Sequence, residues 1–363
     1  MKKTLCLLAV ALLAAVQMYA GRTVRVEYSE MTELVSVVAY MAGTPGYVWD
    51  GKLVEEYRAE VDSAFGGLKS HEAVRFVADS LAPRGFGWDF PMDIALRLEA
   101  DGGVVRMRHD ITTDRFADRI SPCHAEKLVC LLDDFYRESR FHDFFLSHLP
   151  LYRECEAAMR KVVDRIDMTW YDSFFGTNPE AQFRVYPGLL IGPANYAVRQ
   201  SLDDGGEVVN AIMGCCSRNA AGKVFYGLEY TLPVLIHEFN HSFCNPLNKA
   251  CWDSLKEKSE EIYNRAPQFY ASIAYGAPEF VMNETFVEAC VIRYLQTHDT
   301  GIGNDLIEKF VSIDEEEKKF LLIRPLIKIL AEREIRPDLY PTMLQFMPRI
   351  VDTVREYKLG TKE

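Results

Sequence analysis

Two histidines and a glutamate stand close together in this chain, in the order His-Glu-Phe-Asn-His at positions 237 to 241. Residues four apart share one face of a helix, so His237 and His241 can bind the same metal ion. Glu238 then lies beside the open coordination position, where it can accept a proton from a metal-bound water. Zinc lowers the pKa of such a water to about 7. The pattern therefore indicates zinc-dependent hydrolysis, most often of a peptide bond.

The surroundings of this pattern favour a metal site over a coincidence. The bare pattern arises by chance in roughly one or two chains per hundred. Here we expect a helix that begins at an N-cap residue, Thr231, and ends at Asn245 and Pro246. Ionisable side chains on a largely buried helix are costly unless they have partners. The helix is mostly apolar because of Val234, Leu235, Ile236, Phe239 and Phe243.

A catalytic zinc needs a third protein ligand. The metzincin pattern places a histidine at position 247 and a glycine at position 244, but these residues are Leu247 and Cys244. A glutamate on a later helix is the other common source. Glu284 and Glu288 are four residues apart in an otherwise apolar segment, 278–291, so they share a face and either can be the ligand.

The two segments together resemble the gluzincin zinc metallopeptidases, the thermolysin-like group. That group has a ligand glutamate on the second helix, often preceded by asparagine, and an acidic residue four positions later. The resemblance implies that Glu284 binds zinc and that Glu288 orients a ligand histidine. It also implies that Tyr275, nine residues before Glu284, stabilises the oxyanion. The wider chain is similar to an uncharacterised family of secreted bacterial proteins, known only as a domain of unknown function.

The chain departs from thermolysin in three respects. The gap between His241 and Glu284 is longer, and Glu288 stands where aspartate is more usual. The only histidine after the motif is His298, at an expected helix end, so no counterpart of the distant catalytic histidine of thermolysin is evident. These departures leave two alternatives open: a zinc-dependent hydrolase of a non-peptide bond, and a non-catalytic binding module with a zincin fold.

The hydrophobic periodicity predicts an α+β fold that is mostly helical. Residues 21–165 form a helical N-terminal lobe, with helices expected over 30–41, 53–65, 125–136 and 146–163. Residues 166–363 form a zincin-like catalytic region, in which a small sheet accompanies the motif helix and the glutamate-bearing helix, followed by a helical C-terminal part. Segments 196–202 and 207–213 flank Asp-Asp-Gly-Gly and predict a β-hairpin. The acidic run 314–317 predicts a helix start.

The N-terminus and the charge limit the location and the partners. A lysine pair precedes a twelve-residue apolar run, which predicts a signal peptide over residues 1–20, cleaved near Ala20, and export to the periplasm or the exterior. No other segment resembles a membrane span. The formal net charge of −12 disfavours nucleic acid. The expected partner is a peptide or protein substrate, and the expected cofactor is Zn²⁺.

Overall fold

The computed structural model describes residues 23–48, 52–111, 119–176, 181–214 and 217–360. In these residues the chain is mostly helical and carries a small mixed sheet, which confirms the predicted α+β, mostly helical class. The predicted signal peptide lies outside the described residues. Among the helices that the structure describes, none is long and apolar enough to cross a membrane.

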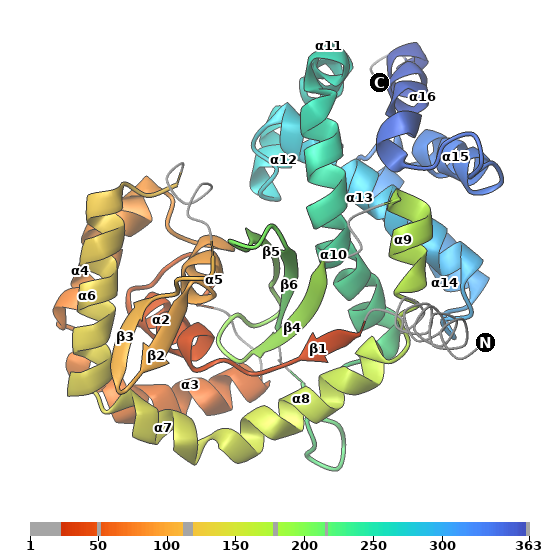
Figure 1. Ribbon diagram of the computed structural model, residues 1–363. Helices are drawn as coiled ribbons and strands as arrows, with labels where there is room; N and C mark the ends of the chain where they lie inside the picture. Colours follow the sequence, from red (N-terminus) through yellow and green to blue (C-terminus); the bar gives the residue numbers. More distant parts are fainter. Residues whose placement is uncertain (1–22, 49–51, 112–118, 177–180, 215–216, 361–363) are drawn as a thin grey trace, which may run out of the picture.

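The N-terminal part is a layer of helices that surrounds a short hairpin on the left of Figure 1. Its elements are α2 (Glu30–Met41), α3 (Lys52–Phe65), α4 (Glu72–Phe76), α5 (Phe90–Ala95), β2 (Leu98–Asp101), β3 (Val104–Met107), α6 (Pro122–Glu138) and α7 (Phe141–Ser147). Helix α8 (Leu149–Val163) leads from this part along the bottom of Figure 1 to α9 (Thr169–Phe175), whose aromatic residues pack with the C-terminal helices. The helix predicted over 146–163 is wrong in one respect, because the chain breaks at His148 between α7 and α8. Pro150 explains this break, since proline fits the first turn of a new helix but not the interior of a continuous one.

A four-stranded sheet lies at the centre of the molecule (Figure 1). The spatial order is β1 (Val24–Val26), β4 (Gln182–Gly188), β6 (Glu207–Gly214) and β5 (Asn195–Ser201). The antiparallel pairing of β5 with β6 confirms the predicted hairpin, and β4 and β1 continue the sheet in parallel. The strand β1 was not predicted, because three residues are too few to show an alternating pattern. The hairpin places β5 at an edge of the sheet.

The two faces of the sheet bury two different hydrophobic clusters. Alternate residues of a strand point to opposite faces. On β6, Val209 and Ala211 therefore join the cluster beneath the C-terminal helices, whereas Ile212 joins the cluster of the N-terminal helices. Helix α8 contributes side chains to both clusters. The predicted domain division at residue 165 stays a prediction.

The C-terminal part packs a set of helices against one face of the sheet, at the upper right of Figure 1. They are α10 (Leu228–Ala250), α11 (Trp252–Tyr263), α12 (Pro267–Ser272), α13 (Pro278–Thr297), α14 (Asn304–Ser312), the π-helical turn η4 (Ile313–Glu317), α15 (Ile323–Glu334) and α16 (Met343–Glu356). The prediction of a helix start at 314–317 is wrong, because these residues end the helical run that begins at Asn304. Sequence reasoning took the acids as a favourable first turn, but here Asp314 is buried against Lys318 and Glu315 pairs with Arg324 of α15, whereas Glu316 and Glu317 are exposed.

Candidate metal centre and substrate cleft

On helix α10, the aromatic residues that pack into the core lie on a different side from the two histidines of the motif. Phe239 and Phe243 lie on the core face, and the ring of Phe239 is 5.1 Å from that of Phe183 on β4, centroid to centroid. Burying each of these rings contributes roughly 1.5–3 kcal/mol, which fixes the rotation of the helix about its axis. His237 and His241 are half-buried on another side, and Glu238 is buried beside them.

The predicted ends of this helix are wrong. Its N-cap is Gly227 rather than Thr231, and it continues past Pro246 to Ala250. A proline inside a helix leaves the carbonyl four residues earlier without its usual amide donor. That carbonyl belongs to Ser242, and Arg199 of β5 donates a guanidinium hydrogen bond to it. The strand therefore supplies the bond that the helix lacks, and the helix can cross the proline.

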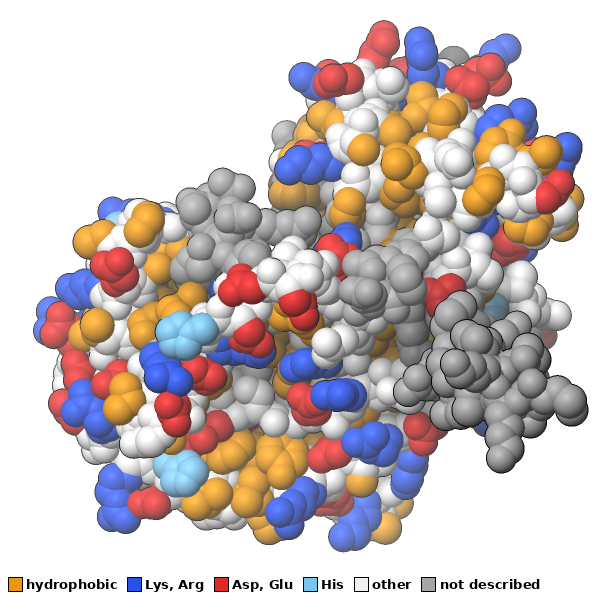
Figure 2. Space-filling model, viewed as in Figure 1, with side chains coloured by type: hydrophobic (Ala, Val, Ile, Leu, Met, Phe, Trp, Pro, Cys, Tyr) orange, Lys and Arg blue, Asp and Glu red, His pale blue; other side chains and the backbone are white. Residues whose placement is uncertain are grey.

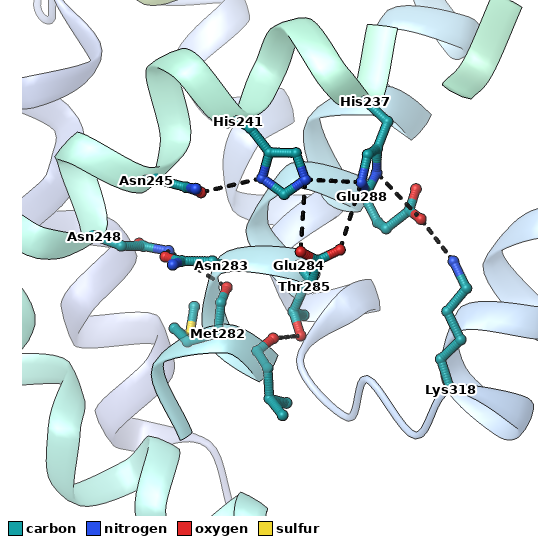
Figure 3. Close-up of polar contacts among 11 residues, drawn as sticks. His237, His241, Asn245, Asn248, Met282, Asn283, Glu284, Thr285, Glu288 and Lys318 are labelled. Carbon is teal, nitrogen blue, oxygen red and sulfur yellow. Dashed lines mark hydrogen bonds and ion pairs between the residues drawn. The ribbon is translucent and has the colours of Figure 1, made fainter. Parts of the chain in front are cut away.

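The side chains of His237, His241 and Glu284 converge on one point between α10 and α13 (Figure 3). The two Nε2 atoms are 2.9 Å apart, and each lies 3.5 Å from an oxygen of Glu284. Neighbouring ligand atoms of a tetrahedral zinc are about 3.3 Å apart, given bonds of about 2.0–2.1 Å. Two ring nitrogens this close need either a shared proton or a cation between them, and a cation is also attracted by the Glu284 carboxylate. The three residues fit a metal ion, and of the two candidate glutamates Glu284 is the one whose oxygens lie near both Nε2 atoms.

The other ring nitrogen of each histidine contacts a side chain that fixes its orientation. Nδ1 of His241 lies 3.3 Å from Oδ1 of Asn245, and Nδ1 of His237 lies 3.4 Å from Oε1 of Glu288. An amide or carboxylate oxygen accepts the Nδ1 proton, which leaves the Nε2 lone pair directed at the metal position. Glu288 thus lies against the ring nitrogen of His237 that faces away from Glu284, and its role in orienting a zinc ligand stays a prediction. Asn245 was taken only as a helix end, although its i, i+4 spacing from His241 was a readable signal.

Two asparagines tie the ligand helices together. The Nδ2 atom of Asn248 on α10 donates to Oδ1 of Asn283 on α13 over 3.0 Å, and also contacts the carbonyl of Met282 at 3.4 Å (Figure 3). Asn248 is fully buried, so breaking this link would leave polar groups unsatisfied. Asn283 directly precedes Glu284, and the link therefore helps to fix the position of the Glu284 carboxylate along α10 relative to the two histidines.

Burial and neighbouring carboxylates alter the pKa values of the motif residues. Burial raises the pKa of Glu238 to about 7, and the charges of Glu284 and Glu288 act in the same direction. Burial lowers the pKa of His237, but the three nearby carboxylates outweigh it and raise that pKa to about 10. Burial lowers the pKa of His241. The cluster therefore holds more negative charge than its histidines neutralise.

Lys318 and Asp314 extend the cluster, and sequence reasoning missed both. Nζ of Lys318 is 2.6 Å from Oε1 of Glu288 and 2.8 Å from Oδ1 of Asp314 (Figure 3 shows the bond to Glu288). Burial opposes ionisation of Glu288, yet Lys318 and His237 lower its pKa well below the usual range. The ammonium therefore keeps Glu288 ionised beside the imidazole. No sequence signal connects position 318 to position 288, because the contact depends on how η4 packs.

Tyr275 lies beside the ligand carboxylate. Its hydroxyl is close enough to Glu284 for that carboxylate to affect its pKa, and its ring is 5.8 Å from that of Phe320, centroid to centroid. Burial, together with the charge of Glu284, raises its pKa well above the usual range, so the hydroxyl stays protonated and can donate. His298 lines neither of the cavities at the metal centre, and its Nδ1 atom contacts the carbonyl of Tyr294 instead.

Two cavities meet at the candidate metal centre and share His237, Glu238 and Tyr275. One, of about 310 Å³, extends towards α14 and η4; its walls include Val234, Val291, Ile292 and Phe310, with Asp314 and Lys318 at the η4 side. The other, of about 390 Å³, extends towards the N-terminal part and β5, and is also lined by Trp88, Asp89, Asn195, Tyr196 and Ala197. Figure 2 shows the surface hollowed between the N-terminal helices and the α11–α12 region. The metal centre therefore lies within a cleft that continues on two sides.

Comparison with known proteins places the chain in a family but provides no activity. No curated protein matches, and no solved structure matches. The model of one family, described as a domain of unknown function, DUF4932, matches residues 25–353, which include every element described above from α2 to α15. The chain therefore belongs to the DUF4932 family.

Proposed function

We propose that this protein is an exported zinc metallopeptidase of gluzincin type. The observation that carries the proposal is the convergence of His237, His241 and Glu284 beside the buried carboxylate of Glu238. Asn283 before the ligand glutamate, and Glu288 four residues after it, support the gluzincin assignment. A structural zinc would be closed by a fourth protein ligand, whereas the described part of the chain brings three ligands together here, beside a cleft.

Each residue of the cluster has a chemical task in this proposal. Zinc, when bound by His237, His241 and Glu284, supplies the Lewis acidity that activates water and polarises a peptide carbonyl. Glu238 accepts the proton of the attacking water and passes it to the leaving nitrogen. The protonated hydroxyl of Tyr275 donates to the oxygen on which negative charge develops. Glu288 and Asn245 hold the two imidazoles in their ligand tautomers.

The shape of the cleft favours a peptide over a small ester or amide. A chain that crosses the centre can place one side chain in the cavity of about 310 Å³, whose walls are mostly apolar. It can continue on the other side along β5, the edge strand of the sheet. An edge strand offers backbone donors and acceptors to an extended peptide.

Glu238→Gln separates catalysis from scaffolding. Glutamine keeps the size of the side chain but cannot accept the proton, so we expect unchanged zinc content and a loss of peptide cleavage of about 10²–10⁴-fold. A fluorogenic peptide library, assayed with and without a zinc chelator, measures this. Equal, chelator-insensitive cleavage by the wild type and the variant would show that the protein is not a zinc peptidase.

Elemental analysis tests the ligand assignment independently of activity. The wild type is expected to hold about one zinc per chain, and Glu284→Ala to lose most of it. Glu288→Ala is expected to retain zinc with an affinity weaker by about 10–100-fold. If instead Glu288→Ala loses zinc and Glu284→Ala keeps it, the roles of the two glutamates are exchanged.

A further inference from the structure

Trp88 is an exposed tryptophan in an unfavourable backbone conformation at the candidate cleft. It lies in the turn before α5, its φ is 56°, and it is 46% exposed. For residues other than glycine the left-handed region costs roughly 1–2 kcal/mol. Full burial of the side chain in a hydrophobic core does not offset this cost, because the residue is partly exposed. It lines the cavity of about 390 Å³ that also contains His241 and Glu284.

The neighbouring segment holds Trp88 in this conformation from both sides. Its amide donates to the carbonyl of Pro45, and its carbonyl accepts from the hydroxyl of Tyr47, both over 3.0 Å. Gly46 lies against its backbone, where a Cβ atom would come within 3.2 Å of the Cα of Trp88 and 2.4 Å of the hydroxyl of Tyr196. Strain that persists because the surroundings determine it is typical of ligand-binding positions.

The same contacts connect Trp88 to the edge strand. The hydroxyl of Tyr196 on β5 donates to the carbonyl of Gly46 over 3.0 Å, and the rings of Tyr47 and Tyr196 stack at 6.2 Å. Asp89 is bound by the guanidinium of Arg119 through both carboxylate oxygens. The charge next to the indole is therefore neutralised, and the tryptophan presents an apolar wall. The turn that contains Trp88 and the strand β5 are therefore connected, and both lie on the side of the cleft next to the N-terminal helices.

We propose that Trp88 is a substrate-contacting residue that selects peptides with an aromatic or large aliphatic side chain on one side of the scissile bond. This inference rests on the proposed peptidase function and names its substrate class. The peptide lies extended beside β5, and one of its side chains packs against the indole. His237, Glu238 and Tyr275 belong to both cavities, so the reacting bond lies between them. The substrate therefore extends on both sides, and the protein cleaves within a chain.

Trp88→Gly is a favourable variant for the test. Glycine adopts a positive φ without strain, so the fold is expected to keep or gain stability while the indole is lost. Trp88→Phe keeps an aromatic ring. The matched control is Phe280→Ala, because Phe280 is exposed by 52% but lines neither cavity. Zinc content should be the same for all of them and for the wild type, and thermal unfolding should show none of the variants to be less stable than the wild type.

The first measurement is binding without turnover. In the Glu238→Gln background, blocked octapeptides that differ only at one position, with Phe, Leu, Ala or Gly there, are titrated by calorimetry. Trp88→Gly is expected to weaken the Phe and Leu peptides about 10-fold and the Ala and Gly peptides less than about 2-fold. Trp88→Phe is expected to stay within about 3-fold of the parent. The control should bind all four peptides as the parent does.

The second measurement is the cleavage profile of a proteome-derived peptide library. The wild type should show a preference for large apolar residues on both sides of the cut, and Trp88→Gly should lose it on one side only. If Trp88→Gly binds and cleaves with unchanged selectivity, the inference is wrong and the peptidase proposal stands. If the parent binds no peptide and the wild type cleaves none, both proposals are wrong.

Discussion

Removing the ammonium of Lys318 should weaken both the fold and the candidate metal centre. In Lys318→Met the alkyl stem remains, but Glu288 and Asp314 lose the cation that they share. Both carboxylates are nearly enclosed, with side-chain exposures of 15% and 4%. Without the shared ammonium, the two buried carboxylates repel each other, so one of them must take up a proton or turn away.

The structure limits the size of this effect. Removing one partner of a buried ion pair costs about 3–5 kcal/mol. The side chain of Lys318 is 33% exposed, so water screens part of its interaction. Burial also raises the pKa of Asp314 to about 7, so this carboxyl accepts a proton readily. We therefore expect the free energy of unfolding to fall by about 1–3 kcal/mol. Zinc affinity should fall about 10-fold, since Glu288 no longer holds His237 in one orientation.

Urea unfolding and a competitive zinc-chelator titration measure the two effects. The matched control is Lys319→Met, because the ammonium of Lys319 lies over the ring of Phe269 rather than on a carboxylate. The double variant Lys318→Met/Asp314→Asn removes the like-charge repulsion and should recover most of the stability. If Lys318→Met behaves like its control in both assays, the ammonium does not support the centre.

Three further outcomes follow from contacts described by the structure. Asn245→Ala should leave the fold unchanged and weaken zinc affinity about 10-fold, measured by the same chelator titration, because the imidazole that it orients becomes free to turn. Arg199→Met should lower the free energy of unfolding by about 1–3 kcal/mol in urea, since the carbonyl of Ser242 loses its donor; an unchanged midpoint would contradict this. Burial raises the pKa of Glu33 to about 7 from 4.5, against the hydrogen bond from Tyr57, so the folded state binds a proton that the unfolded state releases. The contribution of Glu33 to the free energy of unfolding should therefore be fully present below pH 4.5 and be lost as the pH rises through 7. The wild type should lose up to about 3 kcal/mol of stability relative to Glu33→Gln over this range. If the free energies of unfolding of the two proteins change in parallel between pH 5 and 8, this explanation is excluded.

The elements that were predictable from sequence are those with local causes. The helix over 30–41 and the β5–β6 hairpin carry their own periodicity and turn residues, and both were confirmed. The histidine pair needs only the helical repeat, so its convergence was predictable as soon as the helix was. Which of Glu284 and Glu288 lies nearer both Nε2 atoms depends on the register of α13 against α10, to which the buried bond from Asn248 contributes.

The features that escaped prediction depend on distant partners. Pro246 reads as a helix end unless one knows that Arg199 supplies the missing donor. The acidic run that contains Asp314 reads as a helix start unless one knows that Lys318 faces Glu288. Trp88 carries no local signal, since its conformation depends on contacts with Pro45 and Tyr47, which are distant in the sequence. In each case the feature depends on a partner that the local pattern does not reveal.

The balance of charge within the cleft connects these observations. Asp89, which lines one of the two cavities, is paired with Arg119. The other described residues that line the two cavities include four carboxylates but only one ammonium group, that of Lys318. These carboxylates are Glu238, Glu284, Glu288 and Asp314. Buried like charges persist only with compensation. In the proposed metal centre, a divalent cation held by His237, His241 and Glu284 would supply part of this compensation. Lys318 supplies another part at Glu288 and Asp314, and with both cations in place the proposed function assigns the role of base to Glu238.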